Sequence, residues 1–207
     1  MPKLELLVNT GWDLFLGVVP VALGYLLAWG VGRTRPWLRL LWLPVAAAWL
    51  FFLPNAPYLL TEVRHYLSDY AGEFPNSERQ RQRFLFWTGF YLLFSGAGAW
   101  LWTLSVRPVL KGLGRARIPG ALVLPLLSLA SAFGVYLGLR PRFNSWDLLT
   151  RPAEVLRIAR NVLLYEELAC WYILAFGAAL WLLYLAMDAW VDGIALRFKK
   201  DRKTERK

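Results

Sequence analysis

The chain's single histidine follows a glutamate at a spacing that could support catalysis or metal binding. Glu62 and His65 lie three residues apart in the segment Leu53-Pro-Asn-Ala-Pro-Tyr-Leu-Leu-Thr-Glu-Val-Arg-His65. On a helix the two side chains would be neighbours, because residues three or four apart share a face. A carboxylate beside an imidazole suits general acid–base catalysis near neutral pH or the binding of a divalent metal. An ordinary contact on a surface helix is the alternative interpretation.

The same segment places further polar residues on the face that carries this pair. Five residues recur at spacings of 3, 4, 3 and 4: Asn55, Tyr58, Glu62, His65 and Asp69. That spacing follows the turns of an α-helix and predicts one continuous polar stripe. Pro54 and Pro57 interrupt the helix where the stripe begins, within an apolar run where freed backbone groups need protein partners. We therefore predict that Asn55 and Tyr58 bind substrate, with repair of the bend as the alternative role of Asn55.

A second polar segment, Gly134-Val-Tyr-Leu-Gly-Leu-Arg-Pro-Arg-Phe-Asn-Ser-Trp-Asp147, ends a later apolar run. Its arginines could hold a phosphate or a carboxylate, and Asp147 could act as a base or a metal ligand. The residues that we predict to bind substrate here are Tyr136, Arg140, Arg142 and Asn144. A capped turn with arginine–carboxylate pairs is the alternative interpretation.

Together the two segments give a specific hypothesis about a site. Glu62, His65 and Asp147 would converge as catalytic residues, and Glu62 and His65 could bind a divalent metal as the cofactor. Carboxylates held close together raise one another's pKa unless a cation compensates. Arg140 and Arg142 could supply that positive charge.

The elements that must position these residues are long apolar helices. Of the 207 residues, 57% are hydrophobic and 18% are charged, whereas about 25% are charged in an ordinary soluble domain. The apolar runs cover residues 14–32, 40–60, 84–106, 119–139 and 168–191, and each can cross about 30 Å of hydrocarbon. We predict an all-α, polytopic transmembrane helix bundle of five spans. Residues 1–196 would form a single membrane-embedded domain, and residues 197–207 a basic tail.

The basic residues indicate how the bundle is oriented. The net charge is +10, with fourteen Lys and Arg in the tail and in the loops after the first and third spans, against ten on the other side. The positive-inside rule therefore predicts an N-terminus outside the cytoplasm and a cytoplasmic C-terminus. This distribution in loops argues against a nucleic-acid partner, and the basic tail is expected to contact anionic lipid.

An amphipathic helix is expected between the fourth and fifth spans, in residues 151–164. Its apolar face consists of Val155, Ile158, Ala159 and Val162, and Arg157 and Arg160 lie opposite or beside that face. Such a helix is expected to lie on the outer face of the membrane that the bundle spans.

Small residues and two aspartates bear on how the spans pack. Gly134 and Gly138 form a GxxxG pattern, which allows close approach of helices within the bundle or in a homo-oligomer. Asp188 and Asp192 share a face at the end of the fifth span, and we expect them to bind the arginines of the loop after the first span.

The two motifs Pro54-Asn-Ala-Pro-Tyr58 and Asn144-Ser-Trp-Asp147 resemble those of a bacterial family of integral membrane proteins of unknown function. The resemblance extends from the first span to the fifth. It implies a multi-pass protein of the bacterial cytoplasmic membrane, and it implies no activity.

Three kinds of function remain open at this point. The first is an enzyme or binding protein with an extracytoplasmic polar pocket for a lipid-linked or envelope substrate. The second is a non-catalytic assembly or partner protein of the membrane, and the third is a small transporter with a bent helix. Contact between the two motifs around a cavity would favour the first, and a polar path through the bundle would favour transport.

Overall fold

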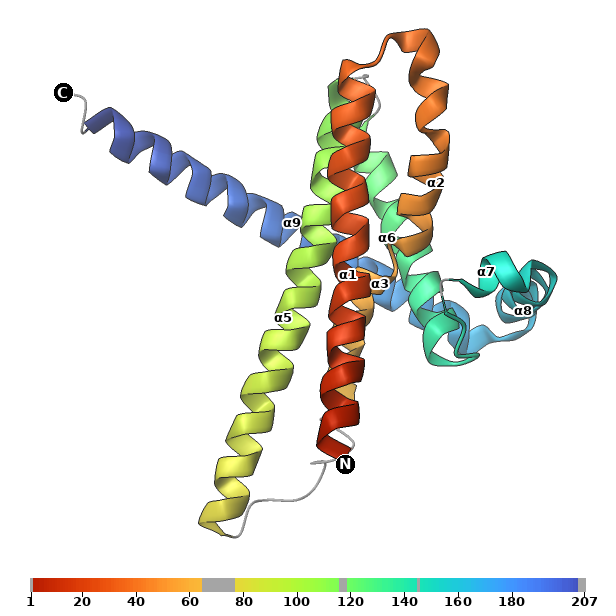
Figure 1. The fold of residues 1–207 in the computed structure, drawn as a ribbon, viewed down its shortest axis with the longest axis vertical. Helices are drawn as coiled ribbons and strands as arrows, with labels where there is room; N and C mark the ends of the chain where they lie inside the picture. The colour runs from red at the N-terminus through yellow and green to blue at the C-terminus, as the bar shows by residue number, and fades with distance from the viewer. Residues whose placement is uncertain (1, 65–76, 116–118, 145, 205–207) are drawn as a thin grey trace.

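The computed structural model describes residues 2–64, 77–115, 119–144 and 146–204, and this part of the chain is helical without strands (Figure 1). In chain order the elements are α1 (Pro2–Arg33), η1 (Pro36–Trp42), α2 (Leu43–Phe52), α3 (Asn55–Tyr58), η2 (Leu59–Glu62), α5 (Glu78–Arg115), α6 (Gly120–Leu139), α7 (Asp147–Thr150), α8 (Pro152–Tyr165) and α9 (Glu167–Thr204). The η elements are 3-10 helices. The prediction of an all-α protein is confirmed.

Five helical stretches are long and apolar enough to cross a membrane, as predicted. They cover Thr10–Arg33, Trp37–Glu62, Glu78–Gly114, Gly120–Leu139 and Glu167–Ile194. Large apolar side chains on them are exposed, among them Leu93, Leu122 and Leu182. Exposed leucines along such helices indicate a lipid environment, because a water-soluble helix would bury most of them.

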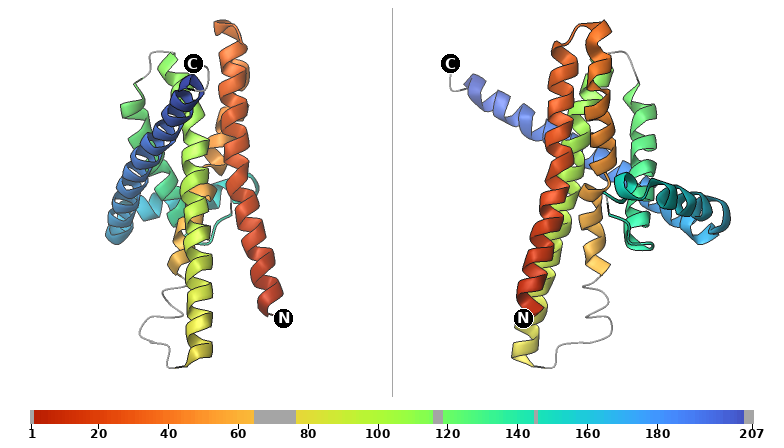
Figure 2. Two further views of the ribbon diagram at one scale, coloured as in Figure 1. Left: turned by 90° about the vertical axis from the view of Figure 1, so that its left-hand side faces the viewer. Right: turned by 45° about the vertical axis from the view of Figure 1, so that its right-hand side comes forward.

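The helices form an elongated bundle with a tilted final helix. α1 packs chiefly against α5 and runs in the same direction, and α6 packs chiefly against α9 (Figures 1 and 2). α2 and α6 return in the opposite direction, whereas α9 crosses the bundle at a steep angle. The N-terminus therefore lies at the same end of the bundle as the end of η2 and the loop after α6.

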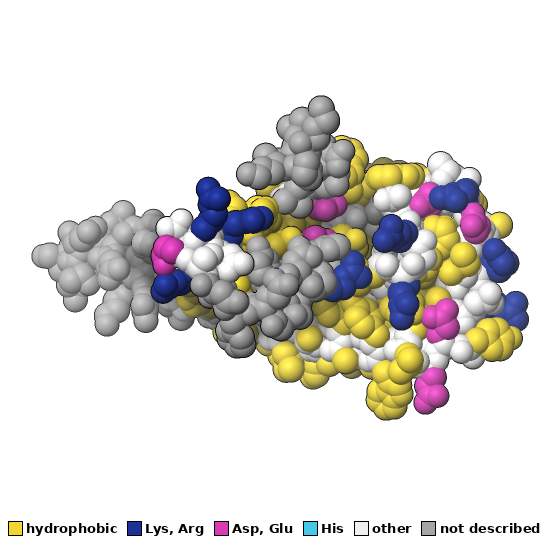
Figure 3. All heavy atoms as spheres, turned by 90° about the horizontal axis from the view of Figure 1, so that it is seen from below, with side chains coloured by type: hydrophobic (Ala, Val, Ile, Leu, Met, Phe, Trp, Pro, Cys, Tyr) yellow, Lys and Arg dark blue, Asp and Glu magenta, His cyan; other side chains and the backbone are white. Residues whose placement is uncertain are grey.

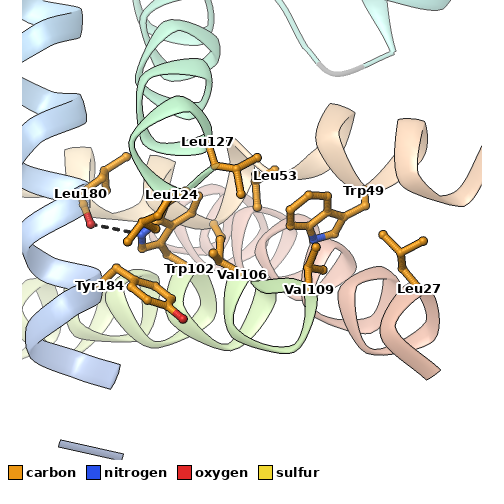
Figure 4. Packing of buried hydrophobic residues seen from close by; sticks show 11 residues of the cluster. Leu27, Trp49, Leu53, Trp102, Val106, Val109, Leu124, Leu127, Leu180 and Tyr184 are labelled. Carbon is orange, nitrogen blue, oxygen red and sulfur yellow. Dashed lines mark hydrogen bonds between the residues drawn. The ribbon is translucent and has the colours of Figure 1, made fainter. Parts of the chain in front are cut away.

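The centre of the bundle is a dry cluster of large side chains from several helices (Figure 4). Trp102 of α5 is fully buried there, and its indole N–H donates to the carbonyl of Leu180 in α9 at 3.4 Å. A second indole, that of Trp49, donates to Ser105 Oγ at 2.9 Å, and Ser105 donates to the carbonyl of Pro20 at 3.0 Å. A buried polar group needs a hydrogen-bond partner. Here the partners lie on different helices, so the bonds of Trp49 and Ser105 connect α2, α5 and α1.

The amphipathic helix between the fourth and fifth spans is present as α8, and Pro152 lies in its first turn. Val155 and Val162 are buried, and Arg157 and Arg160 are exposed. The helix therefore turns one apolar side toward the bundle. Its position on the outer face of the spanned membrane stays a prediction.

The expected pairing of Asp188 and Asp192 is wrong. Both bind Arg107 of α5 instead of the arginines near the end of α1: Arg107 Nε donates to Asp188 Oδ1 at 2.5 Å, and Arg107 Nη2 donates to Asp192. The reason is that α5 continues past Pro108 to Arg115. Arg107 is consequently a helical residue facing α9, not a loop residue.

α9 continues to Thr204, so the helix includes most of the basic segment 197–207. The assignment of this segment as a cytoplasmic tail stays a prediction.

Candidate functional site

The proline bend takes the form of short helical turns with one side-chain repair. α2 ends at Phe52, and the N–H of Ala56 donates to the Leu53 carbonyl at 3.4 Å, three residues back. In a regular helix that N–H would bond to Phe52. The Phe52 carbonyl instead accepts a hydrogen bond from Asn55 Nδ2 at 3.0 Å. Asn55 therefore performs the structural role that its position between two prolines suggested.

The first motif contacts the GxxxG glycines of α6, which precede the second motif in the chain. A Cβ atom on Gly134 would lie 2.8 Å from Cβ of Pro54, and one on Gly138 would lie 3.4 Å from the ring of Tyr58. Only glycine allows α6 to approach the bent segment this closely. The face of α6 that carries Gly134 and Gly138 thus packs within the bundle, which is one of the two interpretations of the GxxxG pattern.

α5 closes the opposite side of the bend. A Cβ on Gly98 would lie 2.9 Å from Cβ of Leu59 and 3.1 Å from the carbonyl oxygen of Ala56. The bent segment is thus held between two glycine-bearing helices, and its position relative to α6 is set by contact of the glycine backbone with the side chains of Pro54 and Tyr58.

A cavity of about 620 Å³ opens beside this contact, at the end of the bundle that holds the N-terminus. Its polar lining comes from both motifs and from three further positions: Asp13, Asn55, Tyr58, Arg64, Arg142 and Asn144. Aromatic side chains and one side of α8 complete the wall: Trp12, Phe51, Phe133, Phe143, Val155, Leu156 and Ala159. Both acidic and basic side chains are visible over this end of the molecule (Figure 3). The volume and the mixed lining suit a small ligand or part of a larger one.

Two arginines give the cavity its positive charge. Among the described residues, the side chains of Arg64 and Arg142 have no hydrogen-bond or ion-pair partner, and the charges of both act on Tyr58. Arg142 has φ 59°, and it is the one non-glycine with positive φ in the described part of the chain. A left-handed backbone costs energy at such a residue. The turn after α6 nevertheless holds it, with the Phe143 N–H donating to Leu137 O at 3.1 Å.

Asp13 is a cavity residue that sequence reasoning missed. It lies in the first membrane-length stretch, which begins at Thr10 instead of the expected residue 14. Glu62 is half-buried and lies within electrostatic range of Asp13 and Tyr58. The signal that could have identified Asp13 is its charge within an apolar span, because ionisable residues at such positions often line sites.

Asp147 is occupied by its own turn. Its side chain is buried; Oδ2 accepts the Asn144 N–H and Oδ1 accepts Arg151 Nη2, each at 2.7 Å. The hydrogen bonds from Arg151 and from Asn144 lower the pKa of Asp147 below its usual value. Asp147 therefore fixes the turn that presents Asn144 to the cavity, and it is not among the residues that line it.

The other predicted residues lie in different surroundings. Tyr136 is buried, and its hydroxyl donates to Glu166 Oε2 at 2.7 Å. Arg140 is exposed and does not line the cavity. His65 lies outside the described residues, so the pairing of Glu62 with His65 and their convergence with Asp147 stay predictions. Within the part of the chain that is described, no three His, Cys, Asp or Glu residues group closely enough to hold a metal ion.

Five membrane-length helices indicate a multi-pass helical membrane protein. The chain belongs to a family described as protein of unknown function (DUF1361), which matches residues 12–183. The expected membership of an uncharacterised family is thereby confirmed. No curated protein and no solved structure matches the chain. The matched range covers every residue that lines the cavity, and it ends before Asp188.

Proposed function

We propose that this protein binds the anionic head group of a lipid-linked or other amphiphilic envelope compound in the cavity beside the proline bend. The observation that supports this most directly is the pair Arg64 and Arg142, which line the cavity and have no carboxylate partner within the described residues. A guanidinium without a partner in a partly enclosed site favours a phosphate or carboxylate ligand.

The walls favour an amphiphile over a small hydrophilic ion. Aromatic side chains from α1, α2 and α6 and apolar side chains of α8 line the same space as the arginines. A ligand with an apolar chain could lie along these side chains while its head group meets the arginines. Asn55, Tyr58 and Asn144 add donors and acceptors for hydroxyl or amide groups of the head.

The positions of the motif residues favour binding over assembly, transport and catalysis. The first motif packs against α6 and residues of both motifs line one cavity, whereas an assembly surface would present them outward. Transport would need a polar path through the bundle, and the centre is instead occupied by the cluster around Trp102. Catalysis by Glu62, His65 and Asp147 would require Asp147 to leave two hydrogen bonds, so binding needs fewer changes to the described side chains.

We also propose which membrane the protein spans and which way it is oriented there. The cavity would open on the extracytoplasmic side of a bacterial cytoplasmic membrane, with the C-terminus in the cytoplasm, because fourteen of the basic residues lie on the C-terminal side. A C-terminal alkaline phosphatase fusion should be inactive, and a C-terminal fluorescent protein should fluoresce. The reverse pattern would overturn the orientation.

A binding measurement tests the proposed ligand class. Purified full-length protein in detergent is titrated with a short polyprenyl phosphate and with the matching polyprenol, which lacks the anion. The phosphate should bind at least a hundredfold more tightly, and the double variant Arg64→Gln/Arg142→Gln should lose a hundredfold or more in affinity for it, since each guanidinium–phosphate bond contributes about 1.5–3 kcal/mol.

A matched control separates the cavity from general surface charge. Arg79 and Arg83 lie near the start of α5 at the same end of the bundle, are exposed and do not line the cavity. The double variant Arg79→Gln/Arg83→Gln should bind the phosphate as the wild type does. Equal losses in both double variants, or equal affinity for the phosphate and the alcohol, would contradict the proposal.

A further inference from the structure

A second cavity, of about 680 Å³, lies between α1 and α5 toward the other end of the bundle, where both helices approach their C-terminal ends (Figure 1). α1 contributes Tyr25, Trp29, Gly32 and Arg33, and α5 contributes Arg107 and Lys111. We refer to this space as the basic groove. None of its residues belongs to the two motifs or to the first cavity.

The basic groove carries an excess of positive charge. Arg107 binds Asp188 and Asp192, and Lys111 Nζ lies 3.8 Å from Asp192 Oδ1. Arg33 has no carboxylate partner in the described part of the chain, and its guanidinium lies 4.9 Å from the ring centre of Trp29. Three cations thus face two carboxylates, which leaves one positive charge for an anion to balance.

One side of the basic groove is lined by aromatic side chains. Tyr25 and Trp29 are about half exposed, at 53% and 55%. A Cβ atom on Gly32 would meet nothing within 4 Å, so the groove is open beside that residue. Aromatic side chains next to basic ones near a helix end are typical of the membrane interface, where the rings meet acyl chains and the cations meet head groups.

We propose that the basic groove binds the phosphate of an anionic phospholipid, with its acyl chains against Tyr25 and Trp29. Arg33 would contact the phosphate directly, since Trp29 holds its guanidinium by a cation–π contact. Lys111 would contact it from the α5 side. This site differs from the basic tail, which would attract anionic lipid without a defined position, and it is independent of the ligand proposed for the first cavity.

Titration of delipidated full-length protein in detergent with short-chain phosphatidylglycerol, phosphatidylcholine and inorganic phosphate tests the proposal. Phosphatidylglycerol should bind about tenfold more tightly than phosphatidylcholine, and the double variant Arg33→Gln/Lys111→Gln should remove that preference. Arg107 is left in place, so the connection between α5 and α9 remains. A second variant, Gly32→Phe, keeps every charge but fills the open space, and it should weaken phosphatidylglycerol binding at least fivefold.

Two controls decide between this groove and weaker explanations. Arg35→Gln/Arg39→Gln removes two cations near the same end of the bundle that do not line the groove, and Lys199→Gln/Lys200→Gln removes two from the basic segment. Both should retain the preference for phosphatidylglycerol. Equal loss in either control, no loss in Gly32→Phe when it folds as the wild type does, or equal affinity for inorganic phosphate and phosphatidylglycerol would overturn the proposal.

Discussion

The two ends of the helix bundle use arginine in different ways. At the cavity end, Asp147 pairs with Arg151 only four residues away, and Arg64 and Arg142 have no partner among the described residues. At the other end, Arg107 reaches Asp188 and Asp192, 81 and 85 residues along the chain, and connects α5 to α9. At the cavity end, glycines of α5 and α6 pack closely against the bent segment, so the two arginines can serve a ligand. At the opposite end, the pairing of Arg107 with two aspartates holds two helices together.

This difference has a consequence for interpreting charged residues in apolar helices. An ionisable group in a membrane span is a candidate for function, yet Arg107 has two carboxylate partners and acts as a structural link. Arg64 and Arg142 lie just past the ends of their spans, have no carboxylate partner in the described residues and line a cavity. The presence of a carboxylate partner therefore separates the two roles.

The largest effect should come from breaking the close packing at the cavity end. Gly134→Leu would place a side chain where Pro54 already lies, and neither backbone can move far because α5 supports the other side of the bend. We expect a loss of about 3 kcal/mol or more, at the upper end for overpacking, or failure to fold. The melting temperature in detergent and the yield of folded protein measure it.

Gly96→Leu is the matched control for that experiment. Gly96 lies in α5, and a Cβ atom there would meet nothing within 4 Å. Leucine should therefore be tolerated and should favour the helix slightly, because glycine is the weaker helix former. If both leucine variants destabilise the protein equally, close approach at Gly134 is not what holds the bent segment against α6.

The next largest effect should come from the opposite end. Arg107→Gln removes the link between α5 and α9 and leaves Asp188, whose side chain is 30% exposed, without its cation. We expect a loss of about 2 kcal/mol, less than the 3–5 kcal/mol of a fully buried pair, because water reaches the carboxylates. Thermal unfolding measures the change.

Arg81→Gln gives the comparison for an arginine pair within one helix. Arg81 and Glu78 are 64% and 67% exposed and belong to the first turn of α5. Their contribution should stay below about 0.5 kcal/mol. A similar fall in melting temperature for Arg107→Gln and Arg81→Gln would mean that Arg107 does not hold the helices together.

A smaller effect is expected at the proline bend. Asn55→Leu deprives the Phe52 carbonyl of the amide that bonds to it, at a cost of about 1–2 kcal/mol. The same change removes a polar group from the cavity, so binding of the polyprenyl phosphate should weaken as well. Asn161→Leu on the exposed side of α8 should change neither quantity. An unchanged melting temperature for Asn55→Leu would contradict the repair role of Asn55.

The helices could largely be predicted from the sequence, because apolar runs of this length have few alternatives. Five spans and α8 lie where the patterns placed them, with ends shifted by up to eight residues. The shifts had consequences. Ending the third span at residue 106 assigned Arg107 to a loop, although the helix tolerates Pro108 and continues to Arg115.

The site could be predicted only in part, for a related reason. Helical spacing correctly grouped Asn55 with Tyr58, and both line the cavity with Arg142 and Asn144. Spacing carries no information about contacts between distant segments, so Asp13 of α1 was missed. Local chemistry was also ambiguous at Asp147, since an acidic residue after a turn can be a catalytic group or the acceptor that orders the turn.

The smallest effect should appear at Asp147, and its size should depend on pH. Its pKa is lowered in the folded protein by the hydrogen bonds from Arg151 and the Asn144 N–H. At neutral pH the carboxylate is charged in the folded and unfolded chains, so its stabilising contribution is fully present. As the pH falls below about 4, the unfolded chain takes up a proton first, and the contribution is lost as the pH approaches the lower folded pKa.

Asp147→Asn should therefore have a lower melting temperature than the wild type at pH 7, and the difference between the two melting temperatures should become smaller at low pH. Glu154→Gln, which alters a longer and more exposed contact with Arg151, should keep the acid response of the wild type. A constant difference between Asp147→Asn and the wild type from pH 7 to pH 3 would show that the charge of Asp147 does not order the turn beside the cavity.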